Sequence, residues 1–435
     1  MRKFISFITA LTLGGSAAFA QANMTLDYEG CLAYALEHNI QLRQSRLTGE
    51  STRLSLDGAK AQWQPTLDAA TTQGVSNHPW GQGNKTVYSS NYALSAGWTV
   101  YNGGQRENTI RRYETVGEMN RFQTLAIERN LQPQILQLYL NILYAAENID
   151  ICRESAAVSA AQAERGKALM ESGRISRVDY AQLESQARQD DYAVVSARAN
   201  YDSQLLQLKS LLQLGIDTDL SVLPYQWTDN VVTSAVPSKL STYDLAVDND
   251  PSLAAARTSV KVSDYDIELA KASGRPSVGL TGGIGVTYNA PGQGAFGTQL
   301  KQSLYESLGV TLSVPIFNQK KTKTAVAIAQ VDRIKAVLDE QQRLDDLSQE
   351  IESWYIDLES ARSRFISGLD RVSATRLSDE LVNEQFELGL VNTVELMQAH
   401  NDYSQARREL LQAKYMAVMA RKMIDYYRTT SIALP

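Results

Sequence analysis

The sequence predicts a mainly α-helical chain with a smaller β part, in which one order of helix, β-hairpin and two long helices occurs twice. Three observations carry this prediction: a repeated apolar–aromatic–asparagine junction, four stretches of two-residue alternation, and two very long polar helix patterns. The composition agrees, because it is rich in good helix formers and has only 10 prolines. Long coiled-coil helices with a few strands are the expected fold class.

The repeat can be measured from residue numbers. Asn102 and Asn318 of the two junctions are 216 residues apart, and the same offset separates Gly173 from Gly389. Earlier landmarks, two prolines and two Gly-Gln-Gly loops, are instead 211 residues apart: Pro65 and Pro276, and residues 81–83 and 292–294. Because the register changes once, within the strand region, we expect an internal duplication with a five-residue loop insertion.

The N-terminus has the pattern of a secretory signal peptide. Basic Arg2 and Lys3 precede an apolar run that ends in small residues at Ala18-Phe19-Ala20, which predicts cleavage after Ala20. We therefore expect a signal peptide at 1–20, a first structural repeat with its linker at 21–240, and a second repeat with a C-terminal tail at 241–435.

Four stretches alternate between apolar residues and small polar residues. Strict alternation of this kind predicts β-strands, and serine, glycine and threonine are too small to pack a core but suit a water-filled lumen. Aromatic residues near the strand ends favour a transmembrane β-barrel over a soluble sheet. Four strands cannot close a barrel, so we expect several copies to pool them in a cyclic oligomer. The stretches are 66–75, 92–100, 277–288 and 307–316.

Helical spacing of apolar residues fills most of the remaining chain. At about 1.5 Å per residue, each long helix would reach roughly 100 Å. The shorter helices are expected to stack end to end on the return helices, with the linker 215–239 outside the helical layers. The expected helices are 28–63, 103–172 and a return to about Leu214, then 243–272, 319–388 and 391–427.

Both long helices turn at a glycine. Gly173 and Gly389 can adopt the left-handed conformation that ends a helix, and Ser176 or Asn392 can cap the next one. Capping alone would explain these residues. A functional interpretation adds that two similar tips form a surface for another protein or a gate.

The signal peptide, the duplicated order and the tip pattern resemble the TolC-like outer-membrane factors over essentially the whole mature chain. The tip pattern is a Gly, an apolar residue and an acid five and six residues later, and then Gln. The resemblance implies a homotrimer in a Gram-negative bacterium: twelve strands form a β-barrel in outer-membrane lipid, and twelve helices form a periplasmic tunnel, so that most of the chain lies in the periplasm. It also implies a passive exit duct that receives substrate from a periplasmic adaptor (membrane fusion) protein and an inner-membrane transporter, in multidrug efflux or type I secretion.

The resemblance also implies site residues at both tips. The adaptor-contact pattern falls on Gly173, Val178, Asp179, Gln182, Gly389 and Val394. For the periplasmic gate, Glu395 takes the place of an acid and Phe386 that of an aromatic residue, while Gln398 replaces a second acid and Val391 stands where a basic residue can occur. Three Glu395 carboxylates around one axis would repel, so proton uptake or a cation would favour closure. The alternative is a solvated glutamate on a helix face.

Other kinds of chemistry find little support in the sequence. The motif GQGAFG (292–297) lies between two alternating strands, which predicts a hairpin loop. A dinucleotide-binding site requires this motif to follow a strand and to open a helix. The histidines His38, His78 and His400 have no zinc-binding spacing, and no catalytic signature is present. A net charge of −6 argues against nucleic acid. We expect no enzyme, no cofactor and no metal.

The two cysteines, Cys31 and Cys152, are expected to be buried hydrophobes rather than a disulfide, because the helix lengths place them too far apart. The remaining alternative to a channel is a periplasmic coiled-coil scaffold without a pore, which would account for the helices but not for the four strands.

Overall fold

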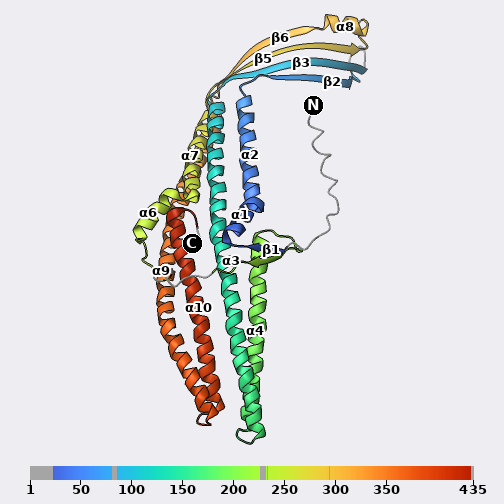
Figure 1. Cartoon of the computed structure of the whole chain (residues 1–435). Helices are drawn as coiled ribbons and strands as arrows, with labels where there is room; N and C mark the ends of the chain where they lie inside the picture. The colour runs from blue at the N-terminus through green and yellow to red at the C-terminus, as the bar shows by residue number, and fades with distance from the viewer. Residues whose placement is uncertain (1–22, 81–85, 226–231, 233, 293, 433–435) are drawn as a thin grey trace. The chain divides into compact units, whose positions relative to one another are not determined.

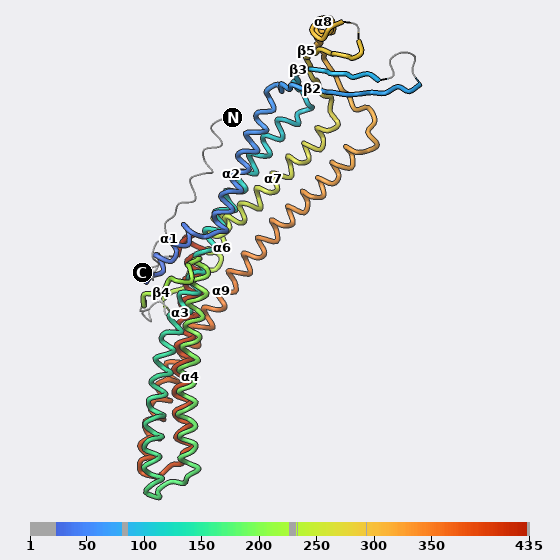
Figure 2. Tube along the Cα trace, turned by 90° about the vertical axis from the view of Figure 1, so that its right-hand side faces the viewer, coloured from blue at the N-terminus to red at the C-terminus, as the bar shows by residue number. Residues whose placement is uncertain are grey.

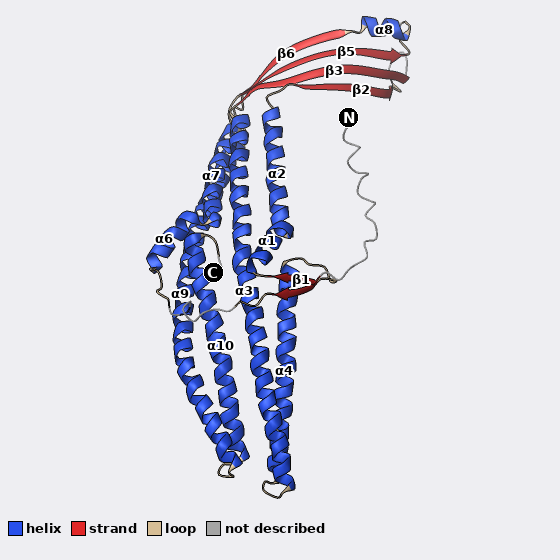
Figure 3. Ribbon diagram, viewed as in Figure 1, coloured by secondary structure: helices blue, strands red, loops and turns tan. Residues whose placement is uncertain are grey.

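The computed structural model describes residues 23–80, 86–225, 232, 234–292 and 294–432. The expected signal peptide (1–20) and the loop 81–83 lie outside these residues. Helices dominate the chain, as the sequence predicts (Figures 1 and 3). Within the described ranges, no helix is both long and apolar enough to cross a membrane.

The chain forms two compact units, each assembled from separate stretches of sequence. Unit 1 comprises the chain up to Arg43, Ala126–Asp250 and Asp345 onward, and unit 2 comprises Gln44–Leu125 and Pro251–Leu344. The two longest helices, α3 (Gln105–Glu171) and α9 (Lys321–Glu387), begin in unit 2 and end in unit 1. Their bounds confirm the two long predicted helices.

Unit 1 contains the turns of both long helices. The hairpins α3–α4 and α9–α10 turn at the same end of this unit (Figures 1 and 2), and their return helices confirm the predicted ones to within a few residues. Besides α3 and α9, its elements are β1 (Asn23–Leu26), α1 (Tyr28–His38), α4 (Arg177–Leu211), β4 (Asp219–Val222), α6 (Lys239–Asn249) and α10 (Thr393–Thr429).

A proline inside α3 is accommodated by a contact from α10. Pro133 has no N–H, so the carbonyl of Arg129 loses its helical hydrogen-bond partner. The Tyr426 hydroxyl donates to this carbonyl at 3.2 Å, and the Arg129 guanidinium lies 4.7 Å from the centroid of the Tyr426 ring. Because this buried carbonyl is satisfied, the long helix continues through the proline.

Unit 2 contains a four-stranded antiparallel sheet. Its strand order is β2-β3-β5-β6, so the two predicted hairpins, β2–β3 and β5–β6, are confirmed and are joined through β3 and β5 (Figure 3). The outer edges of β2 and β6 have no strand partner among the described residues. The elements of this unit besides the starts of α3 and α9 are α2 (Ile40–Ala61), β2 (Thr66–Asn77), β3 (Thr86–Asn102), α7 (Pro251–Ala272), β5 (Ser277–Ala290), α8 (Phe296–Gln302) and β6 (Tyr305–Ser313).

The two shorter helices predicted as continuous are each broken in two. The expected helix 28–63 breaks at Asn39, whose side chain accepts a hydrogen bond from Leu42 N–H at 3.0 Å and thereby caps α2. The expected helix 243–272 breaks at Asp250, which is extended because it precedes Pro251. Asn39 and Asp250 are 211 residues apart, the offset already found for the prolines.

The linker 215–239 contains a short strand, within the described residues 215–225, that packs in the core of unit 1. Its strand β4 pairs in parallel with β1, and Leu220 of β4 is buried in the unit 1 core. The Tyr139 hydroxyl of α3 donates to the carbonyl of Leu223 at 2.9 Å. Strands of four residues are too short to be recognised from alternation, so this sheet was not predicted.

The loop between β5 and β6 contains a helix that the sequence-based interpretation lacks. The last residues of the motif GQGAFG (292–297) begin α8, which lies in the connection between the antiparallel strands β5 and β6, so the motif belongs to a hairpin connection as predicted, but one that contains a short helix. A dinucleotide-binding unit needs two parallel strands around the helix, whereas β5 and β6 are antiparallel. The antiparallel pairing of β5 and β6 therefore disfavours a dinucleotide site at this motif.

The cysteines agree with the prediction. Cys31 and Cys152 are both buried and unpaired. Burial raises the pKa of the Cys31 thiol to about 12 and also raises that of Cys152, which leaves both thiols protonated and unreactive.

Candidate functional site at the two helix tips

The first tip (residues 171–182) and the second tip (residues 387–398) share one backbone turn. Gly173 and Gly389 adopt left-handed conformations with φ of +74° and +72°. In the first tip Gly173 N–H bonds the carbonyl of Met170 and the next N–H reaches back to Leu169, and the same two bonds recur in the second. This pair of bonds is the Schellman motif, and glycine is required there because φ is positive.

The residue after each turn caps the following helix, as predicted. Ser176 Oγ accepts from Asp179 N–H at 3.1 Å and donates to Asp179 Oδ2 at 2.7 Å. Asn392 Oδ1 accepts from Glu395 N–H at 2.9 Å, and Asn392 Nδ2 donates to Glu395 Oε1 at 2.9 Å. Each predicted tip acid therefore occupies the third position of its helix and bonds the cap residue.

The two acids differ in what else they contact. Thr393 of α10, which is 2% exposed, donates through its hydroxyl to Asp179 Oδ1 at 3.1 Å. The carboxylate of Glu395 is exposed, and its hydrogen bond within the described part of the chain goes to its own cap. Hydrogen bonds from the Ser176 hydroxyl, the Ser176 backbone and Thr393 lower the pKa of Asp179. Asp179 thus links the two tips, whereas Glu395 is available to groups outside this chain.

A small apolar cluster lies behind the tips. Its buried members are Leu183 of α4, Phe386 of α9 and Leu396 of α10. An exposed ion pair between Arg165 of α3 and Glu387 of α9 adds a further contact between the hairpins. Phe386 is only 6% exposed, so within one chain it packs between the helices.

The predicted glutamines occupy corresponding places but differ in their hydrogen bonding. Gln398 Nε2 donates to both carboxylate oxygens of Asp402 at 3.2 and 3.3 Å. Gln182 is half-buried, and its side-chain oxygen has no hydrogen-bond partner in the described structure. Asp402 lies seven residues after Glu395, two helical turns along the same face. Sequence analysis missed this acid, although that spacing is visible in the sequence.

Exposed apolar side chains cover the outside of the tips. Val178 of the first tip is 67% exposed and Val394 of the second is 55% exposed. Leu388 and Leu390, on either side of Gly389, are also exposed, whereas the corresponding residues of the first tip are polar. Apolar residues that gather at an exposed turn are typical of a protein-binding surface.

His400 lies in a buried polar layer beside the tips. Its Nε2 is 2.9 Å from Ser155 Oγ of α3, and its Nδ1 is 3.6 Å from Asp379 Oδ1 of α9. Ser155 also bonds Ser404 at 3.0 Å. The layer joins three helices of unit 1, and no group of three or more potential metal ligands occurs in the residues described.

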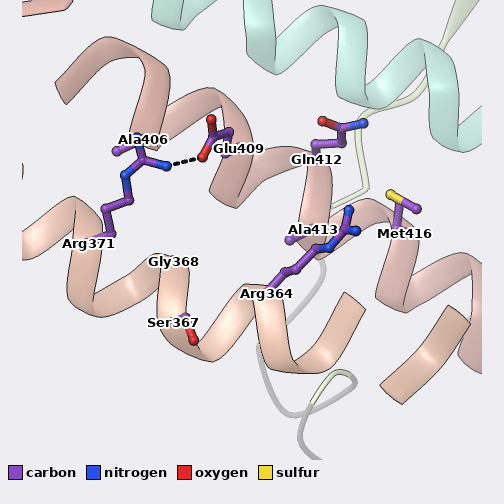
Figure 4. Close-up of a pocket in the computed structure, with 9 residues that line it drawn as sticks. All are labelled: Arg364, Ser367, Gly368, Arg371, Ala406, Glu409, Gln412, Ala413 and Met416. Atoms are coloured by element: carbon purple, nitrogen blue, oxygen red, sulfur yellow. Dashed lines mark hydrogen bonds and ion pairs between the residues drawn. The ribbon is translucent and has the colours of Figure 1, made fainter. Parts of the chain in front are cut away.

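An open groove of about 380 Å³ lies between α9 and α10, away from the tip residues (Figure 4). Figure 4 shows Arg371 of α9 paired with Glu409 of α10, while Arg364 lies on the same helix, closer to the start of α9. The helices approach closely here, because a Cβ built on Gly368 would lie 3.2 Å from Leu410 Cδ1. The groove contains none of the predicted site residues and therefore forms a separate feature of this hairpin.

The chain is similar in sequence to an outer membrane efflux protein and to a secretion protein. It is 22% identical over 414 residues to the outer membrane efflux protein BepC of Brucella suis, covering 94% of this chain and 87% of that relative. It is 24% identical over 302 residues to the alkaline protease secretion protein AprF of Pseudomonas aeruginosa, covering 69% of this chain and 61% of AprF.

Solved channel structures share the fold. The structure of CusC matches with a TM-score of 0.80 at 16% identity, covering 95% of this chain and 94% of that one. The outer membrane protein VceC of Vibrio cholerae matches with a TM-score of 0.76 at 14% identity, covering 93% and 95%. These matches confirm the expected TolC-like fold.

Residues 32–213 and 242–424 match the sequence profile described as outer membrane efflux protein. Together they cover most of the chain, and the fold agrees with that of channel proteins rather than enzymes. The chain therefore belongs to the outer membrane efflux protein family, and it is an outer-membrane duct for efflux or secretion.

Proposed function

We propose that three copies of the chain assemble into one passive exit duct. Each copy contributes four strands, and the edge strands β2 and β6 are free to pair with neighbouring copies. Twelve pooled strands exceed the roughly eight that single-chain barrels need to close, and members of this family are trimeric channels. Most of the remaining chain would then lie in the periplasm.

We further propose that the chain arose by internal duplication, with repeats at 21–240 and 241–435. The two long helices are both 67 residues long. Both tips carry the same turn, and the helix breaks at Asn39 and Asp250 keep the earlier 211-residue offset. A protomer with two repeats would supply two hairpins and two tips.

The tips are the proposed contact surface for a periplasmic adaptor, which would connect the duct to an inner-membrane transporter. The proposed contact residues are Gly173, Val178, Asp179, Gln182, Gly389 and Val394. Val178 and Val394 are exposed at the turns, while Asp179 and Gln182 lie on the first turns of α4. An exposed apolar tip with polar neighbours suits a helical partner.

The proposed gate is formed by Glu395 and Gln398, with Asp402 as the second acid and Phe386 as the buried support behind them. One observation carries this proposal: Asp179 is hydrogen-bonded to the neighbouring tip, whereas among the described residues Glu395 bonds only its own cap. In a trimer, three such carboxylates around the axis would repel one another, and protons or cations would relieve the repulsion.

The test is the single-channel conductance of the purified protein in a planar bilayer. Glu395→Ala removes the mutually repelling charges, so it is expected to favour closure, to lower conductance and to weaken inhibition by divalent cations. Glu184→Ala, which removes an exposed carboxylate of α4, is the matched control and should leave both unchanged. Unchanged conductance and cation sensitivity in Glu395→Ala, with the oligomer intact by mass measurement, would refute the gate.

A further inference from the structure

We propose that the junction between β6 and α9 binds anionic phospholipid headgroups at the margin of the outer membrane. This junction, called the lysine junction here, consists of Ile316, Phe317, Lys320, Lys321 and Lys323. The inference rests on the outer-membrane location of the family and is independent of the proposed gate.

The order of side chains along the lysine junction follows the order of layers at a membrane surface. β6 ends at Ser313, earlier than predicted, because Pro315 cannot donate a ladder hydrogen bond. Ile316 is 95% exposed and continues the exposed aliphatic row of β6, and the aromatic Phe317 that follows it is 83% exposed. Apolar, then aromatic, then cationic residues suit hydrocarbon, the interface and lipid phosphates in turn.

The three lysines have no anionic partner in the part of the chain that the structure describes. Each is exposed, and none forms an ion pair or side-chain hydrogen bond with any described residue. The first turn of α9 contains no acidic residue, although the start of a helix favours negative charge. At the matching position of the first junction, α3 has Glu107 where α9 has Lys323. An anion from outside the chain would resolve this unfavourable arrangement.

The backbone at Lys320 is in a conformation that favours glycine. Gln319 and Lys320 have φ of +54° and +64°, and the matching Gly103 and Gly104 have φ of +69° and +86°. The same turn is therefore built from two glycines at one junction and from Gln and Lys at the other. A side chain kept at a strained position indicates a use for that side chain.

The cation of the first junction is used differently. Arg106 is 3% exposed, and its guanidinium lies 4.3 Å from the centroid of the Trp63 ring. The Arg106 guanidinium is therefore buried against Trp63 and does not face an outside ligand. At Gly103 there is no room for a side chain, because a Cβ there would lie 2.6 Å from Arg275 Cβ. Of the two junctions, the lysine junction is the one that presents its charge to the surroundings.

The experiment counts lipids retained by the full mature protein in detergent, using native mass spectrometry. Dioleoylphosphatidylglycerol is the anionic probe and dioleoylphosphatidylcholine is the neutral comparison. The wild type is expected to prefer the anionic lipid, and the preference should weaken with added salt. The triple variant Lys320→Gln, Lys321→Gln, Lys323→Gln should lose affinity by roughly fivefold for each lysine removed.

Two glycine variants separate lipid binding from backbone strain. Lys320→Gly relieves the strain and removes a charge, so we expect higher thermal stability without lipid but roughly fivefold weaker binding of the anionic lipid. Gln319→Gly relieves similar strain and should leave lipid binding unchanged.

Three results would overturn the proposal. The first is an anionic-lipid preference that persists in the triple variant, and the second is equal binding of both lipids by the wild type. The third is a triple variant that loses its oligomeric mass while lipid bound per chain stays constant, which would assign the lysines to contacts between copies. Lipid is counted per chain, so a failure of the trimer proposal remains distinguishable.

Discussion

The two tips have the same backbone turn but place their acids in different surroundings. The φ values of Gly173 and Gly389 differ by only a few degrees, and the two glycines end their helices with equivalent hydrogen bonds. Asp179 then bonds Thr393 of the other tip, whereas Glu395 remains exposed. The comparison teaches that local sequence determines the turn and the cap, while packing between hairpins determines which acid is available to a partner.

The largest effect is expected from the apolar cluster that holds the tips together. Leu396 is fully buried, so Leu396→Ala should destabilise the tip region by about 2–5 kcal/mol. Val394→Ala, at an exposed position of the same helix turn, should change stability by less than about 0.5 kcal/mol. Hydrogen exchange of amides in both tips measures the difference, and equal effects of the two variants would contradict the assigned burial.

The shared turn predicts equal costs at the two glycines. A Cβ built on Gly173 or Gly389 meets nothing within 4 Å, so an alanine there is strained only through its positive φ. Gly173→Ala and Gly389→Ala should each cost about 1–2 kcal/mol. Hydrogen-exchange protection of the last turns of α3 and α9 measures the two stability costs. Clearly different costs for the two variants would show that the tips are less alike than their geometry indicates.

A smaller effect should distinguish the acids. Thr393→Val removes the hydroxyl that donates to Asp179 and should weaken the coupling between tips by about 1 kcal/mol. A double-mutant cycle with Asp179→Ala should therefore show coupling, whereas a cycle of Thr393→Val with Glu395→Ala should show none. Coupling to Glu395 instead would reverse the roles assigned to the two tips.

The lowered pKa of Asp179 gives the same contact a pH dependence. Its hydrogen bonds stabilise the ionised carboxylate. The contribution of Asp179 to the stability of the folded tips is therefore complete above 3.8, the ordinary pKa of an aspartate, and is lost as pH falls through the lowered pKa of Asp179. Protection factors of the α4 first turn, corrected for intrinsic exchange, should fall in this acid range. Asp179→Asn should flatten the dependence, and an unchanged profile in that variant would assign the titration to another group.

Local features of the fold could be predicted from the sequence because their causes are local. Gly173 and Gly389 require a positive φ, Ser176 and Asn392 have cap side chains, and period-two alternation defines the strands. The break at Asp250 could also have been found, since Pro251 follows it and Asn39 lies at the matching offset. Short-range signals of this kind need no knowledge of the neighbouring helix.

The features that sequence reasoning missed depend on distant partners. β1 pairs with β4 across almost 200 residues, and although both strands alternate (NMTL and DLSV), four residues are too few to identify a strand. Phe386 resembles a gate aromatic from its position, but its burial depends on Leu183 and Leu396 from two other helices. Similarly, the difference between Asp179 and Glu395 arises from one hydroxyl on the opposite tip. Such contacts follow from tertiary packing, and short local patterns do not specify which distant segments meet.

The smallest expected effect concerns the ion pair between Arg165 and Glu387. Both side chains are about half exposed, so water screens the attraction and Arg165→Ala should cost at most about 1 kcal/mol. The effect should disappear at high salt, because the Debye length shortens to roughly 3 Å at 1 M. The exchange measurement used for Leu396→Ala can compare both variants at low and high salt. If Arg165→Ala opened the tips as much as Leu396→Ala, surface charge rather than the buried cluster would hold the two tips together.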